Sequence, residues 1–190
     1  YGAYCIIDEA HAVGVLGNNG NGLVELLNLQ NELFARIITF GKALGCHGAA
    51  ILCNQNLKKY LVNFARSLIY TTGLSPHSVA TILNSYYYLK NNEYFITKLK
   101  DNIDFFTQEI ARLNLNNNFI ISNSAIQCAV ILGNEKVKSI ALQLQQNGFD
   151  VKPILYPTVP RGKERLRFCL HSYNSFEDIS NVLAQLKMLL

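Results

Sequence analysis

The sequence predicts an α/β protein, with a mainly parallel sheet followed by a small α+β domain. In the first part of the chain, apolar runs typical of strands alternate with helical stretches, a pattern that favours parallel pairing. The composition, with 49% hydrophobic and 16% charged residues, provides for a core and argues against disorder. We therefore assign residues 1–91 to the end of a larger sheet domain, and residues 92–190 to a linking helix and a small domain.

Unbroken apolar runs predict strands that are buried on both faces. Residues 3–8, 35–40 and 49–53 have this character, and residues 68–71 resemble a fourth short strand. The first run begins almost at the first residue, which is not a Met, so we expect the chain to be the C-terminal part of a longer protein. Residues 14–22 hold four glycines and three asparagines and are predicted to form a loop.

Capping residues predict the helices of the first part. Asn54 is the expected N-cap of a helix over residues 55–66, where apolar residues recur at helical spacing. Ser75, followed by a proline, starts a helical pattern that continues to about residue 113, with a break near residues 91–92.

The remaining elements are typical of a small α+β domain. Strands are expected at residues 119–122, 126–132, 150–155 and 165–170, and helices at residues 135–147 and 175–189. Gly148 is well placed to end the first of these two helices.

Composition disfavours several classes of function. No apolar run approaches the roughly 20 residues that span a bilayer, so we expect no membrane segment. The net charge is +4, but no basic run reaches five residues, which argues against nucleic-acid binding. The five cysteines include no C-x-x-C pair and lie mostly in apolar runs, which indicates buried free thiols in a reducing cytoplasm. No metal-ligand spacing is present, so no metal is expected.

Two predicted strands are followed by residues that carry chemistry. Asp8 ends the first strand and opens the segment Asp8-Glu9-Ala10-His11, and Lys42 follows the second strand in a glycine-flanked turn. A lysine and a carboxylate at neighbouring strand ends suit pyridoxal phosphate (PLP) above other cofactors. Its aldehyde needs a lysine, and its pyridine nitrogen needs an acid that keeps it protonated.

The segment Asp-Glu-Ala-His also marks a nucleotide-hydrolysing helicase box. That interpretation requires an upstream phosphate loop of the form G-x-x-x-x-G-K-[ST]. The chain contains none, because Gly41-Lys42 is followed by Ala43 and lies downstream of the acid. The motif therefore favours the PLP interpretation.

Further segments accompany these two motifs in a fixed order along the chain. They are Thr39–Lys42, His47–Ala50, Phe64–Arg66, Ile69–Thr72, Ser122–Gln127, Tyr156–Pro160 and Arg165–Arg167. With them, the chain from Tyr4 onward resembles the C-terminal half of the α-oxoamine synthases, a family of fold-type-I PLP enzymes. The resemblance implies that residues 1–91 belong to the large PLP-binding domain. It also implies that the phosphate-binding glycine turn and a ring-stacking histidine lie before Tyr1.

The resemblance assigns catalytic and cofactor-binding roles to three residues. Lys42 would form the Schiff base with PLP, Asp8 would pair with the pyridinium nitrogen, and His11 would reach the phenolic oxygen. The alternatives are a surface lysine, an acid that caps a helix and a structural histidine. Glu9 is assigned a structural role.

Four further residues gain roles from the same resemblance. Thr39 would bind the cofactor phosphate, and Thr71 would reach the phosphate of the partner subunit in a homodimer with composite sites. Arg167 would bind the substrate carboxylate through two parallel donors, and Thr158 would contact the substrate. For the last two threonines, a position at a strand end or in a proline-rich turn is the alternative. Arg165 is expected to face the opposite side of its strand, at an interface or the surface.

The activity implied is that of a PLP-dependent acyltransferase, which joins an amino acid to an acyl thioester with loss of carbon dioxide. Ser122–Gln127 and Phe168–Ser172 are most similar to the family member in biotin biosynthesis, which uses L-alanine and pimeloyl-CoA or pimeloyl-carrier protein. Glycine C-acetyltransferase, 5-aminolevulinate synthase and serine palmitoyltransferase are alternatives within the family. A non-catalytic subunit is an alternative of another class, against which the presence of Lys42 argues. An inactive fragment is a further alternative, and the isolated chain is expected to be inactive, because the resemblance places the phosphate-binding turn before Tyr1.

Overall fold

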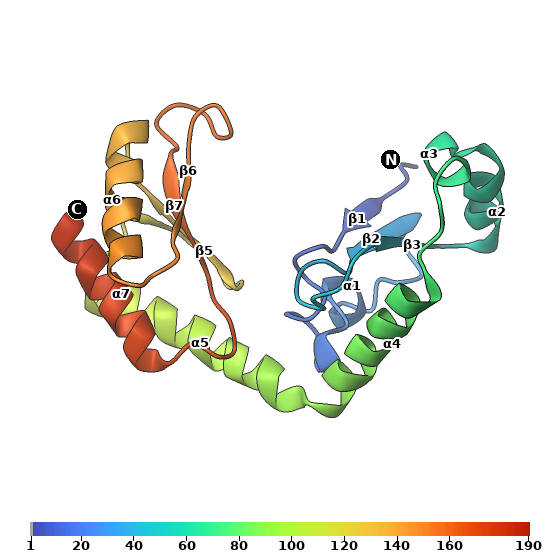
Figure 1. The fold of residues 1–190 in the computed structure, drawn as a ribbon, viewed down its shortest axis with the longest axis horizontal. Helices are drawn as coiled ribbons and strands as arrows, with labels where there is room; N and C mark the ends of the chain where they lie inside the picture. The colour runs from blue at the N-terminus through green and yellow to red at the C-terminus, as the bar shows by residue number, and fades with distance from the viewer. Residues whose placement is uncertain (1) are drawn as a thin grey trace. The chain divides into compact units, whose positions relative to one another are not determined.

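The computed structural model describes residues 2–190, which form two compact units (Figure 1). The first unit ends at Ile96 and the second comprises Thr97–Leu190. The division falls within helix α5 (Glu93–Arg112), a few residues beyond the boundary that the sequence indicates at residues 91 and 92.

A three-stranded sheet organises the first unit. Its strands are β1 (Ile6–Asp8), β2 (Ala35–Thr39) and β3 (Ala49–Cys53), in that spatial order. The pair β1 and β2 is parallel, whereas β2 and β3 are antiparallel. The expectation of a mainly parallel sheet is therefore wrong for β3. Residues 40–48, which connect β2 to β3, are too few for the crossover of a dozen or more residues that parallel pairing needs.

Five helical segments complete this unit. They are η1 (Asn18–Gly20), α1 (Leu23–Leu26), α2 (Gln55–Phe64), α3 (Arg66–Ile69) and α4 (Pro76–Asn91). The predicted caps of the two longer helices are confirmed, because Asn54 accepts from the Leu57 N–H at 2.9 Å and Ser75 from the Ser78 N–H at 3.2 Å. The core of the unit joins the loop after β1, strand β2, the β2–β3 loop and α4 through Val13, Ile38, Phe40, Leu44 and Ile82.

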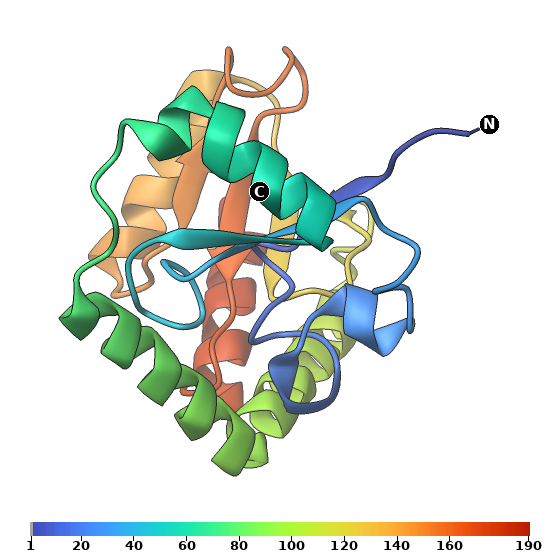
Figure 2. The ribbon, with the colours of Figure 1, turned by 90° about the vertical axis from the view of Figure 1, so that its right-hand side faces the viewer.

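Three further sequence expectations for this unit are wrong. Residues 68–71 do not form a strand, because Arg66–Ile69 form a helical turn in which the Tyr70 N–H donates to the Arg66 carbonyl at 3.1 Å. The first strand is shorter than residues 3–8 and is not buried, since Ile6 is exposed. Strand β3 is not buried on both faces either, since Ile51 and Leu52 are exposed. Among residues 2–190, strand β1 pairs with β2 alone, and in Figure 2 the segment that leads into it projects away from the sheet.

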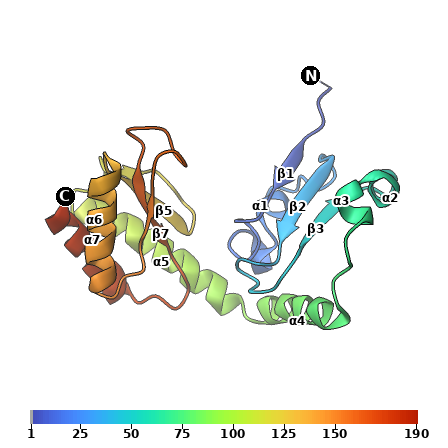
Figure 3. The same cartoon turned by 45° about the horizontal axis from the view of Figure 1, so that its top comes forward.

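The second unit is built on a four-stranded antiparallel sheet. Strands β4 (Phe119–Ile120), β5 (Ile126–Val130), β6 (Lys152–Ile154) and β7 (Arg165–Cys169) lie in the order β4-β5-β7-β6. Helices α5, α6 (Asn134–Gln146) and α7 (Phe176–Leu189) lie on one side of this sheet (Figures 1 and 3). Side chains that point to the helices, such as Leu166 and Phe168, are buried.

Local signals explain the helix ends in this region. Asn92 interrupts the helical pattern between α4 and α5, as the sequence predicts. Ser175 and Asp178 form a reciprocal capping box at the start of α7. Gly148, with φ of +90°, follows α6 in the left-handed region that favours glycine.

The expectation of buried cysteines is wrong for part of the set. All five thiols are free, but Cys5 and Cys169 are exposed, and the other three are half-buried. Apolar neighbours in sequence do not bury these thiols, because Cys5 and Cys53 lie at strand ends, Cys128 and Cys169 lie on the open face or at the end of strands in the second sheet, and Cys46 lies in the β2–β3 loop. Among residues 2–190, no helix combines the length and apolar character needed to cross a membrane.

Candidate functional site

The carboxyl ends of β1 and β2 lie at one edge of the first sheet. Asp8 is the last residue of β1 and pairs with Ile37, two residues before the end of β2 at Thr39. Because the two strands are parallel, their carboxyl ends, and the residues that follow them, lie at the same end of the sheet. Lys42 follows Thr39 by three residues, in the β2–β3 loop. The first unit therefore collects a carboxylate, a hydroxyl and an amine along one edge.

The turn that carries Lys42 is held from both sides by the core. Phe40 and Leu44 are buried, whereas Lys42 is exposed between them. The Gly45 N–H donates to the Lys42 carbonyl at 2.9 Å, and the Cys46 N–H donates to the Phe40 carbonyl at 2.7 Å. The turn thus has a fixed backbone and presents the lysine side chain outward.

A side chain that the sequence does not single out also secures this turn. The Cys46 Sγ lies 3.1 Å from the Leu44 carbonyl oxygen and 3.1 Å from the Ser85 Oγ of α4. These contacts tie the β2–β3 loop to the helix beneath it. No motif indicates the pair Cys46 and Ser85, because they come together only through tertiary packing.

The loop after β1 packs directly against the Lys42 turn. A Cβ atom added to Gly14 would lie 2.4 Å from the Cβ of Ala43, and the φ of Gly14 is +79°. Only glycine allows both this approach and this backbone conformation. The loop that begins with Asp8 and His11 is therefore in contact with the loop that carries Lys42.

Asp8 and His11 occupy exposed positions on this loop. Asp8 Oδ1 accepts a hydrogen bond from the Ala10 N–H at 2.8 Å, which orients the carboxylate at the strand end. His11 lies in the turn that follows, where the Ala12 N–H donates to the Glu9 carbonyl at 2.9 Å.

Glu9 belongs to a separate, buried network, in keeping with its structural role. Its carboxylate forms an ion pair with Arg36 of β2 and accepts from the Val24 N–H at 2.9 Å. Arg36 also reaches the carbonyl of Asn21. A Cβ on Gly22 would lie 2.7 Å from both Glu9 Oε1 and Arg36 Nη2, so any other residue at this position would collide with the ion pair. The network fastens the glycine-rich loop to the sheet.

Thr39 carries the clearest unmet requirement of the site. Its Oγ1 is buried and has no hydrogen-bond partner among the described residues. A buried hydroxyl without a partner is costly, which favours a ligand that accepts from it. Together the edge offers an amine at Lys42, a carboxylate at Asp8 and this hydroxyl, the groups that the aldehyde, pyridine nitrogen and phosphate of PLP require.

Arg167 lies in the second unit, on the face of its sheet that the helices leave uncovered. It pairs with Cys128 of β5 and with Lys152 of β6, and its Nε donates to Cys169 Sγ at 3.2 Å. The expectation that Arg165 faces the opposite side is wrong. Residues two apart on a strand point the same way, and both arginines lie near Cys128.

The environment of Cys128 reflects these two arginines. Burial raises the pKa of its thiol, and the positive charges of Arg165 and Arg167 act in the opposite direction. The uncovered face therefore carries positive charge, which suits a carboxylate ligand.

The remaining candidates are both exposed threonines. Thr71 follows α3, with its N–H 3.5 Å from the Leu68 carbonyl oxygen. Thr158 lies in the loop between β6 and β7. Within residues 2–190, no three His, Cys, Asp or Glu side chains gather as metal ligands.

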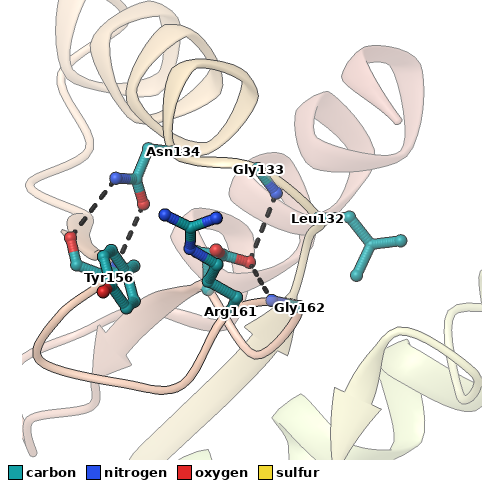
Figure 4. Close-up of a pocket in the computed structure, with 7 residues that line it drawn as sticks. Leu132, Gly133, Asn134, Tyr156, Arg161 and Gly162 are labelled. Carbon is teal, nitrogen blue, oxygen red and sulfur yellow. Dashed lines mark hydrogen bonds between the residues drawn. The ribbon is translucent and has the colours of Figure 1, made fainter.

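A pocket of about 390 Å³ adjoins the loop that carries Thr158 (Figure 4). Its lining residues are Leu132, Gly133, Asn134, Tyr156, Arg161, Gly162 and Glu164. The sequence interpretation assigns no role to Asn134 or Glu164. The nearby glycines are the available signal: Gly133 directly precedes Asn134, and Gly162 lies two residues before Glu164.

The model of the aminotransferase class I and II family matches residues 1–186 of the chain. Among curated proteins, an 8-amino-7-oxononanoate synthase from Emericella nidulans is 39% identical over 184 residues, covering 95% of this chain and 45% of that protein. One from Photorhabdus laumondii is 34% identical over 185 residues, covering 97% of this chain and 47% of that protein. The chain thus spans about half the length of the curated relatives it matches. The resemblance to the α-oxoamine synthases is confirmed.

Solved structures show the same likeness. An 8-amino-7-oxononanoate synthase from Francisella tularensis superposes with a TM-score of 0.86 at 30% identity, covering 96% of this chain and 53% of that one. A serine palmitoyltransferase from S. paucimobilis with a bound PLP–myriocin adduct gives a TM-score of 0.87 at 24% identity, covering 99% and 47% of the two chains. The second likeness establishes the shared fold alone.

Proposed function

Because this chain belongs to the aminotransferase class I and II family, we propose that it carries the cofactor lysine of a PLP-dependent 8-amino-7-oxononanoate synthase. Such an enzyme condenses L-alanine with pimeloyl-CoA or pimeloyl-carrier protein and releases carbon dioxide. The observation that carries the proposal is the shared edge of β1 and β2, which presents Asp8, Thr39 and Lys42. The names of the curated relatives support the choice of substrates.

In this proposal the first unit holds the cofactor. PLP, when bound, withdraws electrons from the α-carbon of the amino acid. The Lys42 amine would bind the aldehyde carbon and, when free, would take a proton from the α-carbon of the amino acid and return one to it. The Asp8 carboxylate keeps a proton on the ring nitrogen, since an anion favours the charged form of that nitrogen. Thr39 Oγ1 would donate to the phosphate, and His11 would contact the phenolic oxygen.

The second unit supplies groups for the substrate. The Arg167 guanidinium binds the carboxylate of the amino acid through two donors, and Thr158 contacts the same substrate.

Thr71 of the first unit would bind the cofactor phosphate of a partner subunit. We therefore propose that the protein is a homodimer with composite active sites, and that it is located in the cytoplasm. The large PLP-binding domain and the small C-terminal domain of the fold-type-I enzymes would correspond to the two units.

The cofactor role of Lys42 can be tested by chemical trapping. Borohydride reduction of the full-length protein with PLP should add the mass of reduced PLP to the peptide that contains Lys42. The Lys42→Ala variant should not form this adduct. Its turnover should fall at least a thousandfold, which corresponds to about 4 kcal/mol of transition-state stabilisation. Lys58→Ala, which changes an exposed lysine of α2, is the matched control and should behave as wild type. An adduct mapped to another lysine would refute the assignment.

The choice of substrates needs a separate measurement. Full-length protein should turn over L-alanine with a pimeloyl thioester faster than glycine or L-serine with acetyl, succinyl or palmitoyl thioesters. A preference for glycine with acetyl-CoA or succinyl-CoA, or for serine with palmitoyl-CoA, would assign the protein to another member of the α-oxoamine synthases.

A further inference from the structure

The loop between β6 and β7, residues 155–164, is attached at both ends to the junction between β5 and α6 (Figure 4). One attachment is made by Glu164 and the other by Asn134. Thr158 lies between the two attachment points and is exposed. The loop is therefore restrained on both sides of the residue that the proposed function places against the substrate.

Glu164 makes its attachment with a buried carboxylate. The residue is 4% exposed, and its Oε2 accepts from the Gly162 N–H at 2.9 Å and from the Gly133 N–H at 3.3 Å. Backbone N–H donors, chiefly its own and then those of Gly133 and Gly162, hold the pKa of Glu164 below its usual range. The carboxylate is therefore ionised at neutral pH and acts as a strong acceptor for both donors.

The two glycines that donate to Glu164 have backbone conformations that other residues rarely adopt. Gly162 has φ of +78° and Gly133 has φ of +90°. In both cases the N–H that donates to Glu164 belongs to a residue in the left-handed region, which favours glycine. One donor belongs to the β6–β7 loop and the other to the start of α6, so the Glu164 side chain links two segments far apart in sequence.

Asn134 makes the second attachment through a reciprocal pair of hydrogen bonds. Its Oδ1 accepts from the Tyr156 N–H at 3.0 Å, and its Nδ2 donates to the Tyr156 carbonyl at 3.3 Å. The Arg161 guanidinium lies 4.8 Å from the centre of the Tyr156 ring, a cation–π contact that joins the two ends of the same loop. Figure 4 shows these side chains converging on one pocket.

We propose that Glu164 and Asn134 are positioning residues that hold the β6–β7 loop in the conformation in which Thr158 contacts the amino-acid substrate. The substrate contact rests on the proposed function, whereas the restraint on the loop does not. A loop restrained before the substrate arrives loses less conformational freedom on binding, so its contacts contribute more to affinity. Removal of either attachment should therefore weaken substrate binding without changing a group that takes part in the chemistry.

The restraint can be measured by backbone hydrogen exchange in the full-length protein loaded with PLP. In Glu164→Ala, exchange at the Gly133 and Gly162 amides should be about tenfold faster or more, because both lose their acceptor. Glu164→Gln keeps one acceptor oxygen and should give a smaller increase. Asn134→Ala should speed exchange at Tyr156, and it provides a second route to the same answer if Glu164→Ala does not fold. Glu135→Ala changes the exposed neighbour of Asn134, which pairs with Lys138, and should change none of these amides.

The positioning role is measured by steady-state kinetics on the same variants. Glu164→Ala and Asn134→Ala should raise KM for the amino acid about tenfold and change kcat less than about threefold, as loss of uniform binding does. Thr158→Ala should raise the same KM, and combined with Glu164→Ala it should give less than the product of the two effects. Unchanged exchange in Glu164→Ala would overturn the proposal, and so would faster exchange with a wild-type KM. If wild-type protein turned over no amino acid with any thioester, the proposed function would fail, and exchange alone would decide whether these residues restrain the loop.

Discussion

The two units differ in how completely their sheets are covered. In the unit Thr97–Leu190, three helices cover one face of the sheet, and most of the buried apolar side chains of the described chain belong to this unit. In the unit that ends at Ile96, large apolar side chains of β3, α2 and α3 stay exposed. These include Ile51, Leu52, Tyr60, Phe64 and Leu68.

The unit with the larger core is not the unit that carries the proposed cofactor-binding residues. The second unit contains the larger core and should contribute most of the free energy of unfolding, since burial of apolar surface is the main favourable term. The first unit contains Asp8, His11, Thr39 and Lys42, and its smaller core lies directly beneath the Lys42 turn. Substitutions in the core of the second unit should therefore mainly lower the free energy of unfolding, whereas substitutions at the site residues of the first unit should mainly lower turnover.

The largest expected effect concerns separate folding of the two units. The segment 93–190, expressed alone, should unfold in one cooperative transition, because its sheet and helices bury one continuous core. The segment 1–92 should show no cooperative transition and should self-associate through its exposed apolar side chains. Denaturant titrations followed by circular dichroism, together with light scattering, measure both. Cooperative unfolding of the first segment as a monomer would remove the basis of the comparison.

Truncation of a phenylalanine should affect the two units unequally. Phe106 is 0% exposed and contacts the rings of Phe119 and Phe168, so Phe106→Ala should cost about 3–5 kcal/mol of unfolding free energy. Phe64, which is 67% exposed on α2, is the matched position in the first unit, and Phe64→Ala should change stability by less than about 0.5 kcal/mol. Urea unfolding of the two variants provides the test, and similar losses in both would contradict the assignment of the core.

Asp8→Asn should lower activity and leave stability unchanged. The carboxylate is exposed, and asparagine can keep the hydrogen bond that Asp8 Oδ1 accepts from Ala10. Loss of the negative charge beside the ring nitrogen should reduce turnover about a hundredfold, or roughly 2.7 kcal/mol in transition-state stabilisation. Turnover of the full-length variant with PLP bound, measured beside its melting temperature, tests this prediction. Wild-type turnover would exclude the proposed role of Asp8.

The smallest effect is a pH dependence of stability in the second unit. Glu109 of α5 accepts from Arg112 at 2.6 and 2.8 Å, and this pairing holds the pKa of the Glu109 carboxyl below its usual range. Because the folded-state pKa is the lower one, the contribution is complete above the unfolded value of about 4.3 and is lost as pH falls through the folded value. Glu109→Gln should therefore be less stable than wild type at pH 7, with the gap closing in acid. Glu135→Gln, in the exposed pair with Lys138, should show a smaller gap.

Capping residues made the helices predictable from sequence. Asn54 and Ser75 mark helix starts that the structure confirms, because a cap depends on residues three positions away. The helical turn at Arg66–Ile69 was not predictable in this way. Its sequence suits a strand, but strand formation requires a neighbouring strand, and local propensity does not supply one.

The site was predictable where it depends on the order of segments and unpredictable where it depends on packing. Asp8 ends one strand and Lys42 follows the next, so their place at the end of the sheet is predictable from the pattern of apolar runs. The partnerless hydroxyl of Thr39 and the attachment made by Glu164 depend on contacts between distant segments. The two-residue period of a strand places Arg165 and Arg167 on the same face, so the orientation of Arg165 is predictable from the sequence.

The close approach of Gly14 and Ala43 also bears on how these positions can vary in evolution. A methyl group at position 14 would collide with the Ala43 Cβ, so Ala43→Gly should recover part of the loss caused by Gly14→Ala. Recovery should be incomplete, because the positive φ of Gly14 disfavours any side chain regardless of the space around it. The two positions are therefore unequal partners. Position 43 can lose its side chain while position 14 keeps glycine, whereas position 14 cannot gain a side chain first without a loss of fitness.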